Sequence, residues 1–168
     1  MSLQNIQLPG EALIRLYNMP LVDLDKKSKN SSASANEPQE IRFLGSNKKN
    51  ITILVNTGDA SFLTDESFSF LTGILNACKL TMDDVALVNI NNLKDSSYTA
   101  INKITRPVIT LLFDVSHNDI GLPLQFPDFQ VHKYNNITFH SAPSLKVLEN
   151  DKPLKAMLWG NLKTLFQL

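Results

Sequence analysis

The chain of 168 residues has a single cysteine, Cys78, and therefore cannot contain an internal disulfide framework. It also lacks an excess of charge, because 16 lysines and arginines balance 16 aspartates and glutamates. Such a balance provides no basic field for strong, direct binding to nucleic acid. No apolar run has the length of a transmembrane span, and the N-terminus has no signal-peptide core. These absences predict a cytoplasmic protein that does not bind a membrane.

The motifs of several enzyme classes are missing as well. The sequence has no G-x-G-x-x-G or Walker phosphate loop, no G-x-S-x-G nucleophile elbow and no cysteine–histidine cluster with zinc spacing. Three histidines, His117, His132 and His140, stand alone in the sequence, where a structural role is commoner than a catalytic one. We therefore expect neither a metal ion nor a cofactor.

Apolar residues make up 43% of the chain, which is enough for a hydrophobic core. The composition divides the sequence into three parts. Residues 1–24 form an N-terminal segment, residues 25–40 have no valine, isoleucine, leucine or aromatic side chain, and residues 41–168 hold most of the apolar runs. The middle part cannot bury apolar surface, so we expect a flexible linker between the N-terminal segment and a single α/β domain.

The N-terminal segment carries a short amphipathic pattern. Leu13, Leu16 and Tyr17 share one face at helical spacing, Met19 flanks that face, and Pro20 ends the pattern. A helix of this length is marginal in water by itself. We expect it either to fold back on the domain or to dock on another protein.

Apolar strands alternate with helical patterns through the rest of the chain. Strands are predicted at 51–55, 85–90 and 107–115, and a fourth is predicted to end near His140. This order is typical of βαβ units with a parallel sheet. We expect a three-layer α/β sandwich with a central, mainly parallel four-stranded sheet, and an extra edge strand near 41–44 that forms a hairpin with 51–55. Thr64 is expected to cap a helix. The end of the chain is expected to be helical, with the apolar stripe Leu154, Leu158, Leu162 and Leu165.

Polar residues follow the predicted strands, where ligands bind in parallel sheets. Asp59 is a candidate general base or a turn residue, and Asn89 a candidate reader of a base edge or a ligand of local backbone. His140 is a candidate stabiliser of a developing anion, or it hydrogen-bonds its own loop. For each of the three, the residue pattern favours the structural role.

Two stretches resemble the psi subunit of bacterial DNA polymerase III. The first is "ITILVNTGDASFLTDESFSFLTGIL" with the following "LTMDDVALVNI", in which Asp59, Leu63, Thr64 and Asp65 match the family pattern. The second is "APSLKVLENDKPLKAMLWGNL", which has the Pro-Ser-Leu turn and the lysine and tryptophan of the family's last helix. Its matching residues are Pro143, Ser144, Leu145, Lys155, Leu158 and Trp159.

The resemblance implies the fold of the uracil-DNA glycosylase superfamily without the enzyme activity. Asp59, Asn89 and the run "HSAPSL" from His140 to Leu145 are similar to the glycosylase motifs. The chain departs from those motifs after Asp59, where Ala60 and Ser61 replace the glycosylase Pro-Tyr pair. Only Phe62 could approximate the aromatic platform that base flipping needs.

The resemblance also implies a role. Psi is an adaptor whose N-terminal peptide binds a clamp-loader subunit and whose body binds the chi subunit. The corresponding anchors here would be Leu13, Leu16, Tyr17 and Met19. The alternative is a glycosylase-like enzyme, or a nucleotide-binding relative, that uses Asp59, Asn89 and His140. A third possibility is a member of the superfamily with an unrelated binding role.

Overall fold

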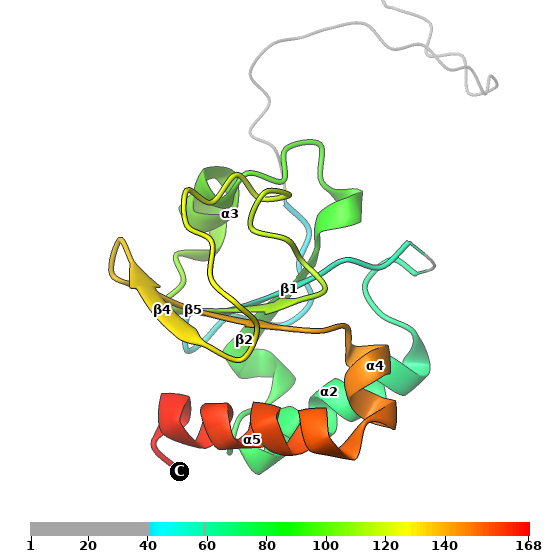
Figure 1. Ribbon diagram of the computed structural model, residues 1–168. Coiled ribbons are helices and arrows are strands. Elements are labelled where there is room, and N and C mark those ends of the chain that lie inside the picture. Colours follow the sequence, from blue (N-terminus) through cyan, green and yellow to red (C-terminus); the bar gives the residue numbers. More distant parts are fainter. Residues whose placement is uncertain (1–40, 59) are drawn as a thin grey trace, which may run out of the picture. The chain divides into compact units, whose positions relative to one another are not determined.

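The computed structural model of the protein describes residues 41–58 and 60–168 (Figure 1). The predicted N-terminal helix, the predicted linker and Asp59 lie outside the described residues. Within them, no helix is long and apolar enough to cross a membrane.

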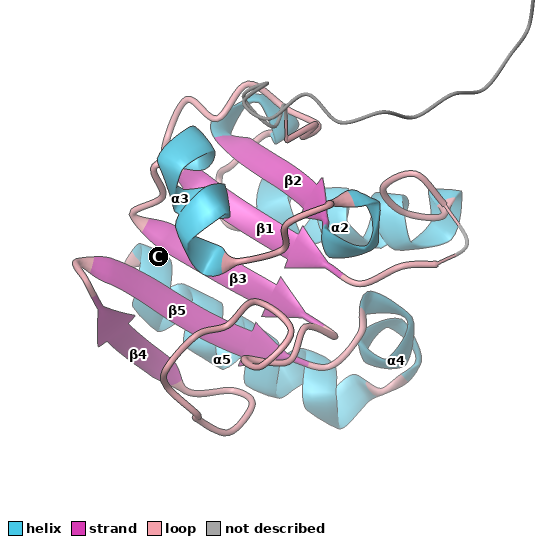
Figure 2. Ribbon diagram, turned by 90° about the horizontal axis from the view of Figure 1, so that it is seen from above, coloured by secondary structure: helices cyan, strands magenta, loops and turns pink. Residues whose placement is uncertain are grey.

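The described residues are built around one five-stranded sheet. Its strands are β1 (Ile51–Val55), β2 (Val85–Asn89), β3 (Ile109–Phe113), β4 (Val131–Tyr134) and β5 (Ile137–Ala142). Their order is β2-β1-β3-β5-β4, and the first four are mutually parallel, whereas β4 runs antiparallel to β5 at the edge (Figure 2). The predicted α/β class with a mainly parallel sheet is confirmed, including its four parallel strands.

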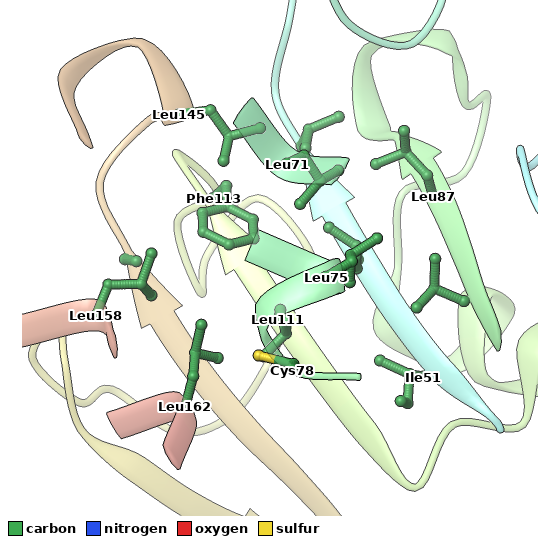
Figure 3. Close-up of a cluster of buried hydrophobic side chains, with 14 of the residues drawn as sticks. Ile51, Leu71, Leu75, Cys78, Leu87, Leu111, Phe113, Leu145, Leu158 and Leu162 are labelled. Atoms are coloured by element: carbon green, nitrogen blue, oxygen red, sulfur yellow. The ribbon is translucent and has the colours of Figure 1, made fainter. Parts of the chain in front are cut away.

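Alternate residues of each strand point to opposite faces of the sheet, and apolar clusters cover both faces. Ile53 and Leu111 belong to an apolar cluster with α2 (Asp65–Ala77), α4 (Leu145–Asn150) and α5 (Lys152–Phe166). Figure 3 shows this cluster, with leucines of the three helices gathered over the sheet and Cys78 beside Leu111. Leu54 and Leu112 belong to a second cluster with α3 (Tyr98–Thr105) and the loop that follows β3. The 3-10 helices η1 (Met82–Asp84) and η2 (Ile90–Asn92) precede and follow β2.

The helices begin where the sequence supplies capping side chains. The hydroxyl of Thr64 accepts the N–H of Ser67 at the start of α2, as predicted. The predicted C-terminal helix is interrupted: α4 ends at Asn150, Asp151 caps a new helix, and Pro153 lies in its first turn. Leu158 is buried against the sheet. Trp159 is only partly buried, with the Lys163 ammonium 5.3 Å from the centre of its indole ring.

The predicted hairpin between 41–44 and 51–55 is wrong. Leu44 instead forms an isolated antiparallel bridge with Leu87 of β2, through N–H to carbonyl hydrogen bonds of 2.9 and 2.8 Å. Ion pairs from Lys48 to Asp83 (3.0 Å) and from Lys49 to Asp84 (3.5 Å) hold the next turn. Residues 44–49, here called the strap, therefore cover the outer edge of β2.

The fifth strand, β4, was not predicted at all. Its sequence, "VHKY", is short and half polar, as is usual for an edge strand that needs no second buried face. Its turn gave a usable signal. Asn135 and Asn136 both adopt positive φ angles, of 48° and 63°, as the two central residues of a type I′ hairpin turn do.

Candidate functional site

Asn89 lies at the carboxyl end of β2, and its side chain is 1% exposed. Its carboxamide nitrogen donates to the carbonyl oxygens of Thr57 (2.7 Å) and Ala60 (3.1 Å). Its carboxamide oxygen accepts the backbone N–H groups of Thr57 (3.3 Å) and Asn91 (3.2 Å). Two donors and two acceptor positions are all that a carboxamide offers. The side chain is therefore fully engaged by the protein's own backbone.

Two neighbouring asparagines extend this arrangement. The carboxamide of Asn91 donates to the side-chain oxygen of Asn56 (2.6 Å), and that of Asn92 donates to the carbonyl of Ser61. We call Asn89, Asn91 and Asn92 the asparagine clasp. From the end of β2 and from η2, they bind the loop that follows β1. The sequence predicted Asn89 at this edge, but it did not reveal that all three asparagines bind the same loop.

His140 lies inside β5 and not at its end, because the strand continues to Ala142. It pairs with Leu111 of β3 and Val131 of β4, and its side chain is fully buried. Neither ring nitrogen has a hydrogen-bond partner among the described residues. Burial lowers the pKa of His140 to about 4, and the negative charge of Asp128 offsets a part of that effect. The imidazole is therefore neutral at physiological pH and is shielded from any ligand in solution.

The structure does not bring Asn89 and His140 together. In the sheet register, Asn89 is level with Val55, Phe113 and Ala142, whereas His140 lies two residues earlier on β5. Strands β2 and β5 are separated by β1 and β3. Three steps of about 4.8 Å place the two residues at least about 14 Å apart. The third candidate, Asp59, lies outside the described residues.

His117 and His132 are far apart in the sequence, but both rings contact Phe126 in the structure. The ring of His117 lies edge-on to Phe126 with centroids 4.2 Å apart, and His132 stacks on Phe126 at 4.5 Å. Burial lowers the pKa of His117, Asp128 opposes this effect, and His132 adds to it. No motif could have shown this cluster, since the loop after β3 and the edge strand β4 meet only in the folded chain.

A cavity of about 490 Å³ opens beside this cluster, beyond the carboxyl end of β3. Its lining is neutral and contains no lysine, arginine or carboxylate: Ser116, His117, Asn118, Gln125, Phe126 and Pro127. The Ser116 hydroxyl accepts the backbone N–H of Asn118 (3.4 Å), and no hydrogen bond joins it to a histidine within the described chain. The walls could donate hydrogen bonds to a neutral group, but they offer no paired nucleophile and base.

Other reactive combinations are also missing from the described part of the chain. The Ser141 hydroxyl donates to the carboxylate of Asp128 (2.6 Å), so this serine has an acid partner and no imidazole base. No three histidine, cysteine, aspartate or glutamate side chains are placed to hold a metal ion among residues 41–58 and 60–168. Burial raises the pKa of Cys78, which makes its thiol a poor nucleophile.

No protein-family model and no curated protein matches this sequence. The likeness to the psi subunit therefore depends on the two sequence stretches quoted above, and the functional argument depends on the geometry of the described residues.

Proposed function

We propose that the protein is a non-catalytic adaptor, similar in role to the psi subunit of bacterial DNA polymerase III. It links a clamp-loader subunit to a chi-like subunit in DNA replication, and it holds no cofactor. Its domain is a three-layer member of the uracil-DNA glycosylase-like superfamily. A sheet with four parallel strands and helices on both faces supports that assignment at the level of architecture.

The observation that carries the proposal is the full occupation of the Asn89 carboxamide. A glycosylase-like enzyme would need this amide free to form hydrogen bonds with a base. Here the loop after β1 takes both of its donors and one acceptor position, and the backbone N–H of Asn91 in η2 takes the other. Freeing the amide would break four hydrogen bonds to partly buried or exposed residues, at a cost of about 0.5–1.5 kcal/mol for each. The asparagine thus has a structural role, which supports an adaptor over an enzyme.

The position of His140 supports the same conclusion. The alternative enzyme would need Asp59, Asn89 and His140 around one substrate. A fully buried imidazole about 14 Å or more from Asn89 cannot contact a base that Asn89 binds. The chain also lacks the Pro-Tyr pair after Asp59.

The first test measures enzyme activity directly. The purified protein should release no uracil from single- or double-stranded DNA that contains it. Release that disappears in Asp59→Asn would show an enzyme and would sink the adaptor proposal.

The second test measures the predicted contact with the clamp loader. The full chain should bind the clamp-loader complex of its own organism in a pull-down, and removal of residues 1–29 should abolish that binding. Replacing Leu13, Leu16, Tyr17 and Met19 together by alanine should have the same effect. A control with Glu11→Ala and Asn18→Ala changes the same segment but leaves the apolar side chains, and should still bind. Binding that survives the fourfold replacement would show that these anchors are wrong.

A further inference from the structure

The two edges of the sheet differ in whether another segment of the described chain covers them. The strap covers the outer edge of β2 through the bridge between Leu44 and Leu87. The outer edge of β4 has no such cover, because no backbone hydrogen bond reaches it from another part of the described chain. An uncovered edge offers free N–H and C=O groups to another strand.

The register of the sheet identifies the free groups. Thr138 of β5 donates its N–H to Val108 on the β3 side, so Ile137 and Phe139 direct their backbone groups toward β4. Their partners on β4 are Tyr134 and His132. Because directions alternate along a strand, Val131 and Lys133 point their N–H and C=O groups outward. The open edge therefore offers four backbone groups, the N–H and C=O of Val131 and of Lys133.

The side chains of the same two residues give the edge a chemical character. Val131 is 39% exposed, and Lys133 is exposed with no carboxylate within ion-pair distance in the described chain. Both lie on the α5 face of the sheet, because they pair with His140 and Thr138. Residues 131–168 carry five lysines against two acidic residues: Lys133, Lys146, Lys152, Lys155 and Lys163 against Glu149 and Asp151. The nearest carboxylate before β4, that of Asp128, accepts a hydrogen bond from Ser141. Lys133 is therefore the charged group of the edge itself, and it favours an acidic partner.

We propose that β4 is a docking edge for an extended, acidic segment of a partner protein, which adds a sixth strand to the sheet. The segment exchanges backbone hydrogen bonds with Val131 and Lys133. It places an apolar side chain beside Val131 and a carboxylate beside Lys133. This inference rests on the proposed adaptor role for the existence of a protein partner, and it adds the surface and chemistry of the contact.

A lysine on an edge strand commonly prevents unwanted pairing. That function is compatible with docking, because a lysine repels basic segments and favours an acidic one. The type I′ turn at Asn135 and Asn136 also holds β4 in a regular hairpin. The edge is therefore preformed, and little ordering of the protein is needed when a strand is added.

The test uses two synthetic peptides with blocked ends and the full-length protein. The acidic peptide, Ser-Thr-Glu-Thr-Val-Thr-Ser, places glutamate opposite Lys133 and valine opposite Val131 when it pairs antiparallel. The control peptide has lysine in place of glutamate. Amide signals and amide hydrogen exchange are followed by NMR. At half-saturation with the acidic peptide, exchange at Val131 and Lys133 should slow about twofold, and at nine times the Kd about tenfold. The amides of His132 and Tyr134, already bonded to β5, should change little.

Three variants separate the backbone contact from the charge contact. Val131→Pro removes one outward N–H without removing a bond to β5, and should weaken acidic-peptide binding at least about tenfold. Val131→Ala keeps that N–H and should bind within about threefold of the original chain. Lys133→Glu should reverse the preference, so that the lysine peptide binds more tightly. An unchanged amide spectrum outside β4 and its neighbours shows that each variant is folded.

Several results would overturn the inference. One is the absence of any change at Val131 and Lys133 with millimolar acidic peptide. Another is equal binding of the two peptides. Protection of these amides that grows with protein concentration alone would show that a second copy occupies the edge. Peptide binding combined with a failed clamp-loader pull-down would leave this inference standing and remove the proposed function, so the two can fail separately.

Discussion

At the scale of single residues, Asn89 shows how a polar side chain at a strand end can be structural. Its carboxamide holds Thr57, Ala60 and Asn91 by four hydrogen bonds in a buried position. Asn89→Ala would leave these backbone groups without partners and should lower the free energy of unfolding by about 2–4 kcal/mol. Urea denaturation of both proteins measures this difference.

Asn76 provides the matched control for that variant. It is exposed near the end of α2, and its side chain makes no hydrogen bond to a described residue. Asn76→Ala should change the free energy of unfolding by no more than about 0.5 kcal/mol. Equal effects of the two substitutions would show that the asparagine clasp contributes nothing to stability.

His140 makes stability depend on pH. Its folded pKa of about 4 is below the ordinary value of 6.5, so the unfolded chain binds the proton more tightly. The stabilisation is fully present above about pH 6.5 and is lost as pH falls toward 4. The loss should amount to about 3 kcal/mol.

Thermal melts between pH 7.5 and pH 4 measure this dependence. His140→Leu removes the titrating group at a buried position and should flatten the profile between pH 6.5 and 4. A variant with the same slope as the original chain would assign the acid sensitivity to other groups.

At the scale of elements, the sequence predicted the buried parts better than the edges. Long apolar runs such as 51–55 and 107–115 have few alternatives to a buried strand, and β1 and β3 lie within them. The strap and β4 are short, and their positions are decided by which edge of the sheet is free. That information is tertiary, so the pattern of residues 41–44 suggested a hairpin with the wrong strand.

The candidate site was predictable only as a list of residues. The position of Asn89 at a strand end followed from the apolar run before it. Its four partners did not, because they depend on the path of the loop after β1. The fourth strand was predicted to end near His140, and β5 ends two residues later, at Ala142, because the polar Ser141 and the small Ala142 give a weak apolar signal even though both are buried.

The strap provides a prediction at this scale. Gly45 has a φ angle of 109°, and a Cβ atom there would collide with the carbonyl oxygens of Val85 and Met82. Gly45→Ala must therefore move the strap away from β2, which should lower the free energy of unfolding by about 2–4 kcal/mol. Calorimetric melts of the purified variant measure the loss.

Gly73, in the middle of α2, is the control for Gly45. A Cβ atom there meets nothing within 4 Å, and its φ angle is helical. Gly73→Ala should stabilise the protein by about 0.5–1 kcal/mol because alanine favours the helix. Destabilisation by both alanines would show that backbone strain at the strap is not the cause.

At the scale of the whole molecule, the two apolar clusters share one sheet. Ile53 and Leu111 face α2 and α5, while Leu54 and Leu112 on the same strands face α3. If the packing on one side of a strand is lost, the strand moves, and its side chains on the other side lose their packing as well. The two sides should therefore unfold together, as they do in most single domains of this size.

Leu158→Ala tests this coupling from one side. Leu158 is 2% exposed on α5, so its truncation should cost about 2–5 kcal/mol. The neighbouring Met157 is 51% exposed, and Met157→Ala should cost less than about 0.5 kcal/mol.

Two signals report on the two faces of the sheet. The fluorescence of Trp159, the only tryptophan, reports on the α5 face. Near-ultraviolet circular dichroism of the tyrosines, including the contact pair Tyr98 and Tyr134, reports on the opposite face. In Leu158→Ala both signals should shift to the same lower urea midpoint, because the sheet transmits the loss to the α3 side. Separate midpoints would mean that the α5 layer unfolds by itself, and that the domain is not a single cooperative unit.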